Sequence, residues 1–126
     1  MSQPAFRVSA RARSFRFAAR GVVALLRTQH NAWIHAAASV GVVALGLRVG
    51  LSRVEWSLVV LAMIVVWSAE ALNTALEALC DVASPAAHPL VERAKDIAAG
   101  AVLLAAVGAA IVGLLIFGPH LLPRGG

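Results

Sequence analysis

The sequence has little of what soluble proteins use to face water. Only 13% of its 126 residues are charged and 60% are hydrophobic, whereas soluble domains average about a quarter charged residues. Its one cysteine, Cys80, excludes a framework of internal disulfides. A chain of this size and composition has no room for a soluble catalytic domain, and it predicts an all-α membrane protein.

Three apolar stretches are long enough to cross a membrane. They cover about residues 33–49, 55–80 and 96–118, and a helix rises about 1.5 Å per residue against a hydrocarbon core about 30 Å thick. Ser52, followed three residues later by Glu55, predicts a capping box at the start of the second stretch. We therefore expect three transmembrane helices, with residues 119–126 as a short tail.

The region before the first span is rich in arginine. Residues 1–13 predict a basic, flexible tail. In residues 14–29, apolar side chains recur at helical spacing opposite Arg16, Arg20 and Arg27. This pattern predicts an amphipathic helix in the membrane interface, with its arginines among the headgroups and its apolar face toward the acyl chains.

Basic residues are distributed unevenly about the predicted spans. Eight of the eleven precede the first span or lie between the second and the third: Arg7, Arg11, Arg13, Arg16, Arg20, Arg27, Arg93 and Lys95. By the positive-inside rule, this side and the amino terminus are cytoplasmic. The net charge of +5 then indicates attraction to anionic lipids. Nucleic acid is not an expected partner, because the chain has no soluble basic face.

The second span carries polar residues where an apolar helix is expected. Four of them fall on one narrow stripe at about 100° per residue: Glu70, Asn73, Glu77 and Asp81. The stripe rises about 16 Å along the helix, beginning inside the apolar zone and ending near the connector that precedes Lys95. An acidic side chain deep in a bilayer costs about 2.5 to 3.5 kcal/mol, so we predict a functional site here.

The stripe has two interpretations. In the first, Glu70 and Asn73 are hydrogen-bond partners between helices, while Glu77 and Asp81 form a solvated helix end. In the second, a carboxylate in a dry site acts as a general base, and carboxylates near the water hold Mg²⁺ together with nucleotide phosphates. The second combination indicates phosphoryl transfer to a lipid hydroxyl, by a site that has no Walker-type loop or protein-kinase signature.

Several ordered motifs resemble those of the small prokaryotic integral-membrane diacylglycerol kinase and undecaprenol kinase family. They are ExxNTxxE from Glu70, the aspartate at Asp81, and SPxxHPLxxxAKDxAAGAVLL from Ser84. The similarity extends from Phe15 to Phe117 and includes FRFAARG and the NAWIH segment that ends at His35. The ordered set is specific, whereas EALNTALE alone would be unremarkable.

The resemblance implies a fold, a reaction and a set of residues. It implies a homotrimer in the bacterial inner membrane, with active sites shared between subunits, that uses ATP and Mg²⁺ to phosphorylate undecaprenol or diacylglycerol. It assigns catalysis to Glu70 and Asn73, metal binding to Glu77, and nucleotide binding to Asp81, Lys95 and Asp96, with Asp96 orienting Lys95. The family's other metal-binding glutamate corresponds to Gln29, which keeps an oxygen ligand but loses the charge, so we expect weaker metal affinity.

Two readings from other classes compete with a lipid kinase. One is a non-catalytic membrane scaffold that oligomerises through the Gly- and Ala-rich third span. The other is a transporter or ion-binding subunit that uses Glu70, although residues 97–117 offer no charged or amide side chain for a polar path. The NxxIH and SPxxHPL segments favour the undecaprenol branch of the family.

Overall fold

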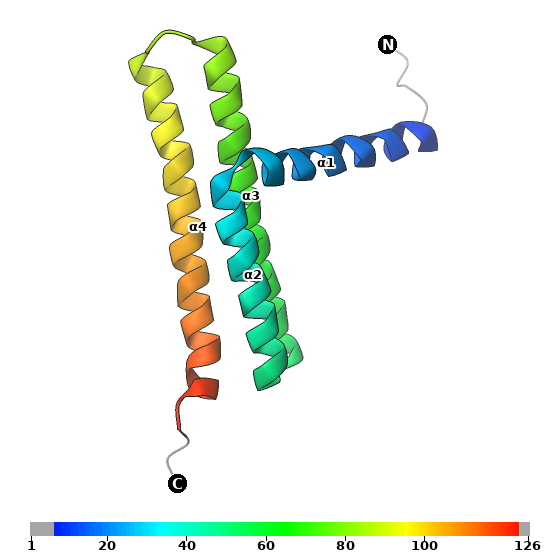
Figure 1. Ribbon diagram of the computed structural model, residues 1–126, viewed down its shortest axis with the longest axis vertical. Coiled ribbons are helices and arrows are strands. Elements are labelled where there is room, and N and C mark those ends of the chain that lie inside the picture. The colour runs from blue at the N-terminus through cyan, green and yellow to red at the C-terminus, as the bar shows by residue number, and fades with distance from the viewer. Residues whose placement is uncertain (1–6, 124–126) are drawn as a thin grey trace.

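The structure, a computed structural model that describes residues 7–123, consists of four helices and no strand over this range. They are α1 (Val8–Thr28), α2 (His30–Val49), α3 (Arg53–Ala83) and α4 (Pro89–Leu121). Figure 1 shows α2, α3 and α4 side by side and α1 lying across their direction. Helices α2, α3 and α4 are long and apolar enough to span a membrane, so the predicted all-helical membrane fold is confirmed.

The helices are longer than the spans predicted from hydropathy. Helix α1 begins at Val8, so residues 8–13 of the expected flexible tail are helical; alanine and arginine, which dominate them, are strong helix formers. Residues 1–6 of that tail and 124–126 of the carboxyl-terminal tail lie outside the described range. Residues 119–121 of the second tail belong to α4.

Helices α3 and α4 extend beyond the thickness of a bilayer. With 31 and 33 residues, they measure about 46 and 50 Å, against a hydrocarbon core of about 30 Å. We call the end where residues 84–88 connect α3 to α4 the loop end, and the end where residues 50–52 connect α2 to α3 the turn end. In Figure 1 the loop end reaches past the level of α1.

The turn end is tightly built. Gly50 ends α2 with a left-handed backbone (φ 73°), a conformation that glycine adopts without strain. The predicted capping box is present: Ser52 Oγ accepts from the Glu55 amide at 3.2 Å, and Glu55 Oε2 accepts from the Ser52 amide at 2.7 Å. A methyl group added at Gly46 would stand 2.7 Å from the Trp56 ring, so only glycine allows this approach of α2 to α3.

The packed core of the bundle also lies at the turn end. Its buried members come from the turn, α3 and α4: Leu51, Val59, Ile116 and Phe117. Helices α3 and α4 are antiparallel, and one polar contact marks each end of the pair. Lys95 meets Asp81 at the loop end, and His120 meets Glu55 at the turn end. This register brings the end of the polar stripe beside the first turns of α4.

Candidate active site

Glu70 is the one buried charged residue in the described part of the chain, with 3% of its surface exposed. It lies on α3, and its Oε2 is 3.5 Å from Nε2 of His35 on α2. A buried carboxylate is destabilised unless a polar or charged group accompanies it. The structure therefore places a histidine beside the residue that the sequence predicts as a general base.

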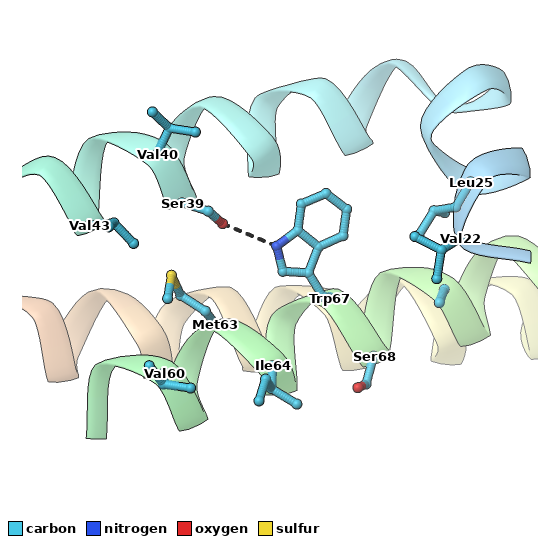
Figure 2. A pocket seen from close by; sticks show the side chains of 11 residues that line it. Val22, Leu25, Ser39, Val40, Val43, Val60, Met63, Ile64, Trp67 and Ser68 are labelled. Carbon is cyan, nitrogen blue, oxygen red and sulfur yellow. Dashed lines mark hydrogen bonds between the residues drawn. The ribbon is translucent and has the colours of Figure 1, made fainter. Parts of the chain in front are cut away.

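His35 has neighbours on two helices, one at its ring and one at its backbone carbonyl. The rings of His35 and Trp67 meet in a T-shaped arrangement, with centroids 6.1 Å apart and an interplanar angle of 63°. The indole N–H of Trp67 donates to Ser39 Oγ at 3.0 Å, and the Ser39 hydroxyl donates to the carbonyl of His35 at 2.7 Å. Figure 2 shows this bond between Trp67 and Ser39 crossing from α3 to α2. We did not place His35 in the site from sequence; its position in NAWIH was the available signal.

The next turn of the stripe contains polar atoms without partners. Asn73 Oδ1 and Thr74 Oγ1 are buried, and neither has a hydrogen-bond partner among the described residues. Leaving such a group unpaired costs about 1 to 3 kcal/mol. The site is therefore suited to a polar ligand or to a polar group from another protein chain.

The loop end carries a charged pair. Lys95 Nζ donates to Asp81 Oδ1 at 2.6 Å, with side chains that are 35% and 68% exposed, and the charge of Glu77 also acts on the Lys95 amine. We expected Asp96 to orient Lys95, but the partner of Lys95 is Asp81. Neighbouring residues on a helix point about 100° apart, and the Asp96 side chain is exposed.

Gln29 lies at the break between α1 and α2, where its extended backbone (φ −113°, ψ 118°) turns the chain. The contact between His35 and Glu70 shows which residues of α2 and α3 lie at the same level. From Glu70 to Glu77, α3 rises about 10 Å, and from His35 back to His30, α2 rises about 8 Å in the same direction, with Gln29 directly before it. By this estimate, Gln29, just before α2, and Glu77 on α3 lie at about the same level.

The oxygen donors of this region fit magnesium only with help from a ligand. No group of three or more histidine, cysteine, aspartate or glutamate residues within residues 7–123 is arranged to hold a metal ion. The Glu77 carboxylate and the Gln29 amide supply two oxygen donors. Mg²⁺ is usually bound through one or two carboxylates together with phosphates and waters, so this donor set fits a magnesium ion that arrives with a nucleotide.

Comparison with known proteins decides the family. The family model for prokaryotic diacylglycerol kinase matches residues 16–117. The chain belongs to the prokaryotic diacylglycerol kinase family. It is 45% identical to an undecaprenol kinase of Bacillus subtilis over 109 residues, which cover 86% of this chain and 89% of that relative. It is 41% identical to a diacylglycerol kinase of Synechocystis sp. over 110 residues, which cover 86% of this chain and 63% of that relative.

This member of the prokaryotic diacylglycerol kinase family has two apolar grooves, whose linings include neighbours of Glu70 but none of the four stripe residues. A groove of about 670 Å³ lies between α1, α2 and α3, lined by side chains that include Val22, Val43 and Ile64 (Figure 2). A second groove, of about 310 Å³, lies between α2, α3 and α4 and has His35 in its wall. Both offer apolar surface to a lipid chain, and membership of a kinase family favours an enzyme over the scaffold and the ion-binding subunit.

Proposed function

We propose that the protein transfers the γ-phosphoryl group of ATP to the hydroxyl of a membrane lipid, undecaprenol or diacylglycerol. The observation that carries this proposal is Glu70: a buried carboxylate on a membrane-length helix, from which a polar stripe leads to Lys95 at the loop end. Such an arrangement gives a lipid hydroxyl a base in an apolar setting and gives ATP access from water.

The transfer requires a base at the hydroxyl. Glu70 accepts the proton as the lipid oxygen forms a bond to the γ-phosphorus, and the bond from that phosphorus to the β,γ-bridging oxygen breaks. The products are the phosphorylated lipid and ADP, and Glu70 then releases its proton to solvent. Asn73, whose Oδ1 has no partner among the described residues, orients the hydroxyl.

The loop end binds the nucleotide in this proposal. Lys95 contacts the phosphates, while Asp81 and Asp96 complete the nucleotide site. Glu77 and Gln29 would hold Mg²⁺, which when bound neutralises phosphate charge during transfer. The common level of Gln29 and Glu77 supports their pairing.

The proposal includes an orientation and an assembly. The loop end faces the cytoplasm of a bacterial inner membrane, because most of the arginines lie on that side. Three copies form a homotrimer with shared sites. The partnerless atoms of Asn73 and Thr74 and the largely exposed apolar faces of the helices support contact with further copies.

Undecaprenol is the acceptor that we propose first. The relative named as an undecaprenol kinase matches along 89% of its length, and the one named as a diacylglycerol kinase along 63%. The NxxIH and SPxxHPL segments, which we assigned to the undecaprenol branch, support the same choice.

The test measures the transfer of labelled phosphate from ATP to lipid in mixed micelles that contain undecaprenol or diacylglycerol. The Glu70→Gln variant is the negative control. Incorporation into undecaprenol that the variant abolishes supports both the reaction and the acceptor. Incorporation into diacylglycerol alone keeps the reaction and changes the acceptor. A folded protein that labels neither lipid, and whose thermal stability does not respond to ATP, contradicts the kinase and favours the scaffold.

A further inference from the structure

The structure contains two contacts between a histidine and a glutamate, and they differ in their surroundings. His120 Nε2 lies 3.0 Å from Glu55 Oε1 at the turn end, where both side chains are more than one fifth exposed. His35 Nε2 lies 3.5 Å from Glu70 Oε2, where the side chains are 19% and 3% exposed. Only the second pair includes the carboxylate to which the proposed function assigns the chemistry.

His35 is the polar neighbour of the Glu70 carboxylate. Within residues 7–123, this contact is the one ion pair of the Glu70 carboxylate, and no side-chain hydrogen bond reaches it. Glu55, in contrast, is already held by the Ser52 amide in the capping box. A carboxylate with a single polar neighbour takes its orientation from that neighbour, because apolar contacts do not distinguish its two oxygens.

His35 is itself fixed in place. The edge contact with Trp67 restricts rotation of the imidazole ring, and Trp67 is tied to α2 through Ser39. Its Nε2 atom is therefore kept on the side of Oε2 of Glu70, at 3.5 Å.

We propose that His35 is a positioning residue for Glu70. His35 Nε2 lies 3.5 Å from Oε2 of Glu70, and a proton on that nitrogen attracts Oε2 and leaves Oε1 to accept the proton of the lipid hydroxyl. This inference rests on the proposed function, since it assigns a partner to the same base. A misplaced catalytic group lowers the rate of the chemical step while both substrates still bind, so the contribution of His35 belongs to kcat and not to KM.

The experiment compares three variants of the full-length protein in lipid micelles. His35→Leu removes the donor, His35→Gln keeps a side-chain N–H, and His120→Leu breaks the matching contact at the turn end. We expect His35→Leu to lower kcat about 10- to 100-fold with KM for ATP and lipid changed less than about threefold. His35→Gln should recover at least about a third of kcat, and His120→Leu should retain it within about twofold. Thermal melting of each variant reports folding.

The possible results distinguish a failure of this inference from a failure of the proposed kinase function. Full kcat in a folded His35→Leu, or a His35→Gln as slow as His35→Leu, overturns the positioning role. So does an equal loss in His120→Leu, which would indicate a general effect of helix packing. If Glu70→Gln abolishes transfer while His35→Leu does not change it, the kinase stands and His35 is structural. If the wild-type protein phosphorylates no lipid, the proposed function fails first.

Discussion

The two ends of the α3 and α4 pair differ in how completely their polar groups are satisfied. At the turn end, Glu55 accepts from Ser52 and contacts His120, next to the packed core around Val59 and Phe117. In the half of α3 nearer the loop end, which we call the loop half, Asn73 Oδ1 and Thr74 Oγ1 have no partner among the described residues. The satisfied and the unsatisfied polar groups therefore both belong to one helix, α3.

Along α3, the groups expected to stabilise the fold lie at the turn end, and the groups expected to act in catalysis lie in the loop half. Capping boxes and close packing stabilise a helix end and need no ligand. Partnerless buried polar atoms destabilise a protein and persist where something else binds them. Substitutions at the turn end should therefore change melting, and substitutions at the loop half should change catalysis.

The largest expected effect beyond those of Glu70 and His35 is at Lys95. Lys95→Met removes the amine that Asp81 holds, and a hydrogen bond to a charged group contributes about 1.5 to 3 kcal/mol. We expect KM for ATP to rise about 10- to 100-fold. Arg93→Met, a nearby exposed cation, is the matched control and should change KM little. Similar rises in both variants would mean that overall charge, and not Lys95 itself, attracts the nucleotide.

At the turn end, the next effect is on stability. Gly46→Leu forces a side chain against the Trp56 ring, whereas Gly41, on the same helix, has open space around its Cβ position. Overpacking costs about 1 to 3 kcal/mol, so Gly46→Leu should lower the melting temperature in micelles and Gly41→Leu should not. Phosphate transfer at a temperature where both variants are folded should be unchanged. A loss of kcat in a folded Gly46→Leu would show that the two ends are coupled.

A smaller effect is expected at the helix cap. Ser52→Ala removes the oxygen that accepts from the Glu55 amide, which costs about 1 kcal/mol. Ser57→Ala is the matched control, because Ser57 donates only to the carbonyl of Arg53 within the helix. Thermal melting should distinguish the two variants. Equal melting temperatures would indicate that the turn at residues 50–52, and not the Ser52 cap, stabilises the start of α3.

Features determined by neighbouring residues were predictable from sequence. The capping box at Ser52 follows from a four-residue pattern, and the three apolar helices follow from composition over about 20 residues. The start of α1 was missed because a run of arginines resembles a flexible tail, while the helix propensity of residues 8–13 favours a helix.

Contacts between helices were not predictable in the same way. His35 meets Glu70 across 35 positions of sequence, and this meeting depends on the register of α2 against α3, which the turn at Gly50 and the close approach at Gly46 determine. The partner of Lys95 was misassigned for the same reason: Asp96 is adjacent in sequence, whereas Asp81 is adjacent in space. The roles of the stripe residues remain proposals, supported by the resemblance and by the placement of their side chains.

The smallest expected effect is tighter binding of Mg²⁺. It tests the loop half most directly, because a substitution that improves binding cannot be explained by damage to the fold. Gln29 is level with Glu77 but supplies no charge, so Gln29→Glu adds a carboxylate where the proposed Mg²⁺ would bind. Two unit charges about 4 Å apart in water attract each other by about 1 kcal/mol, and a divalent ion doubles this attraction, so we expect the Mg²⁺ concentration for half-maximal transfer to fall at least about fivefold. Gln29→Ala should raise that concentration. If neither variant changes the Mg²⁺ dependence, Gln29 is not a ligand, and the break between α1 and α2 serves only to turn the chain.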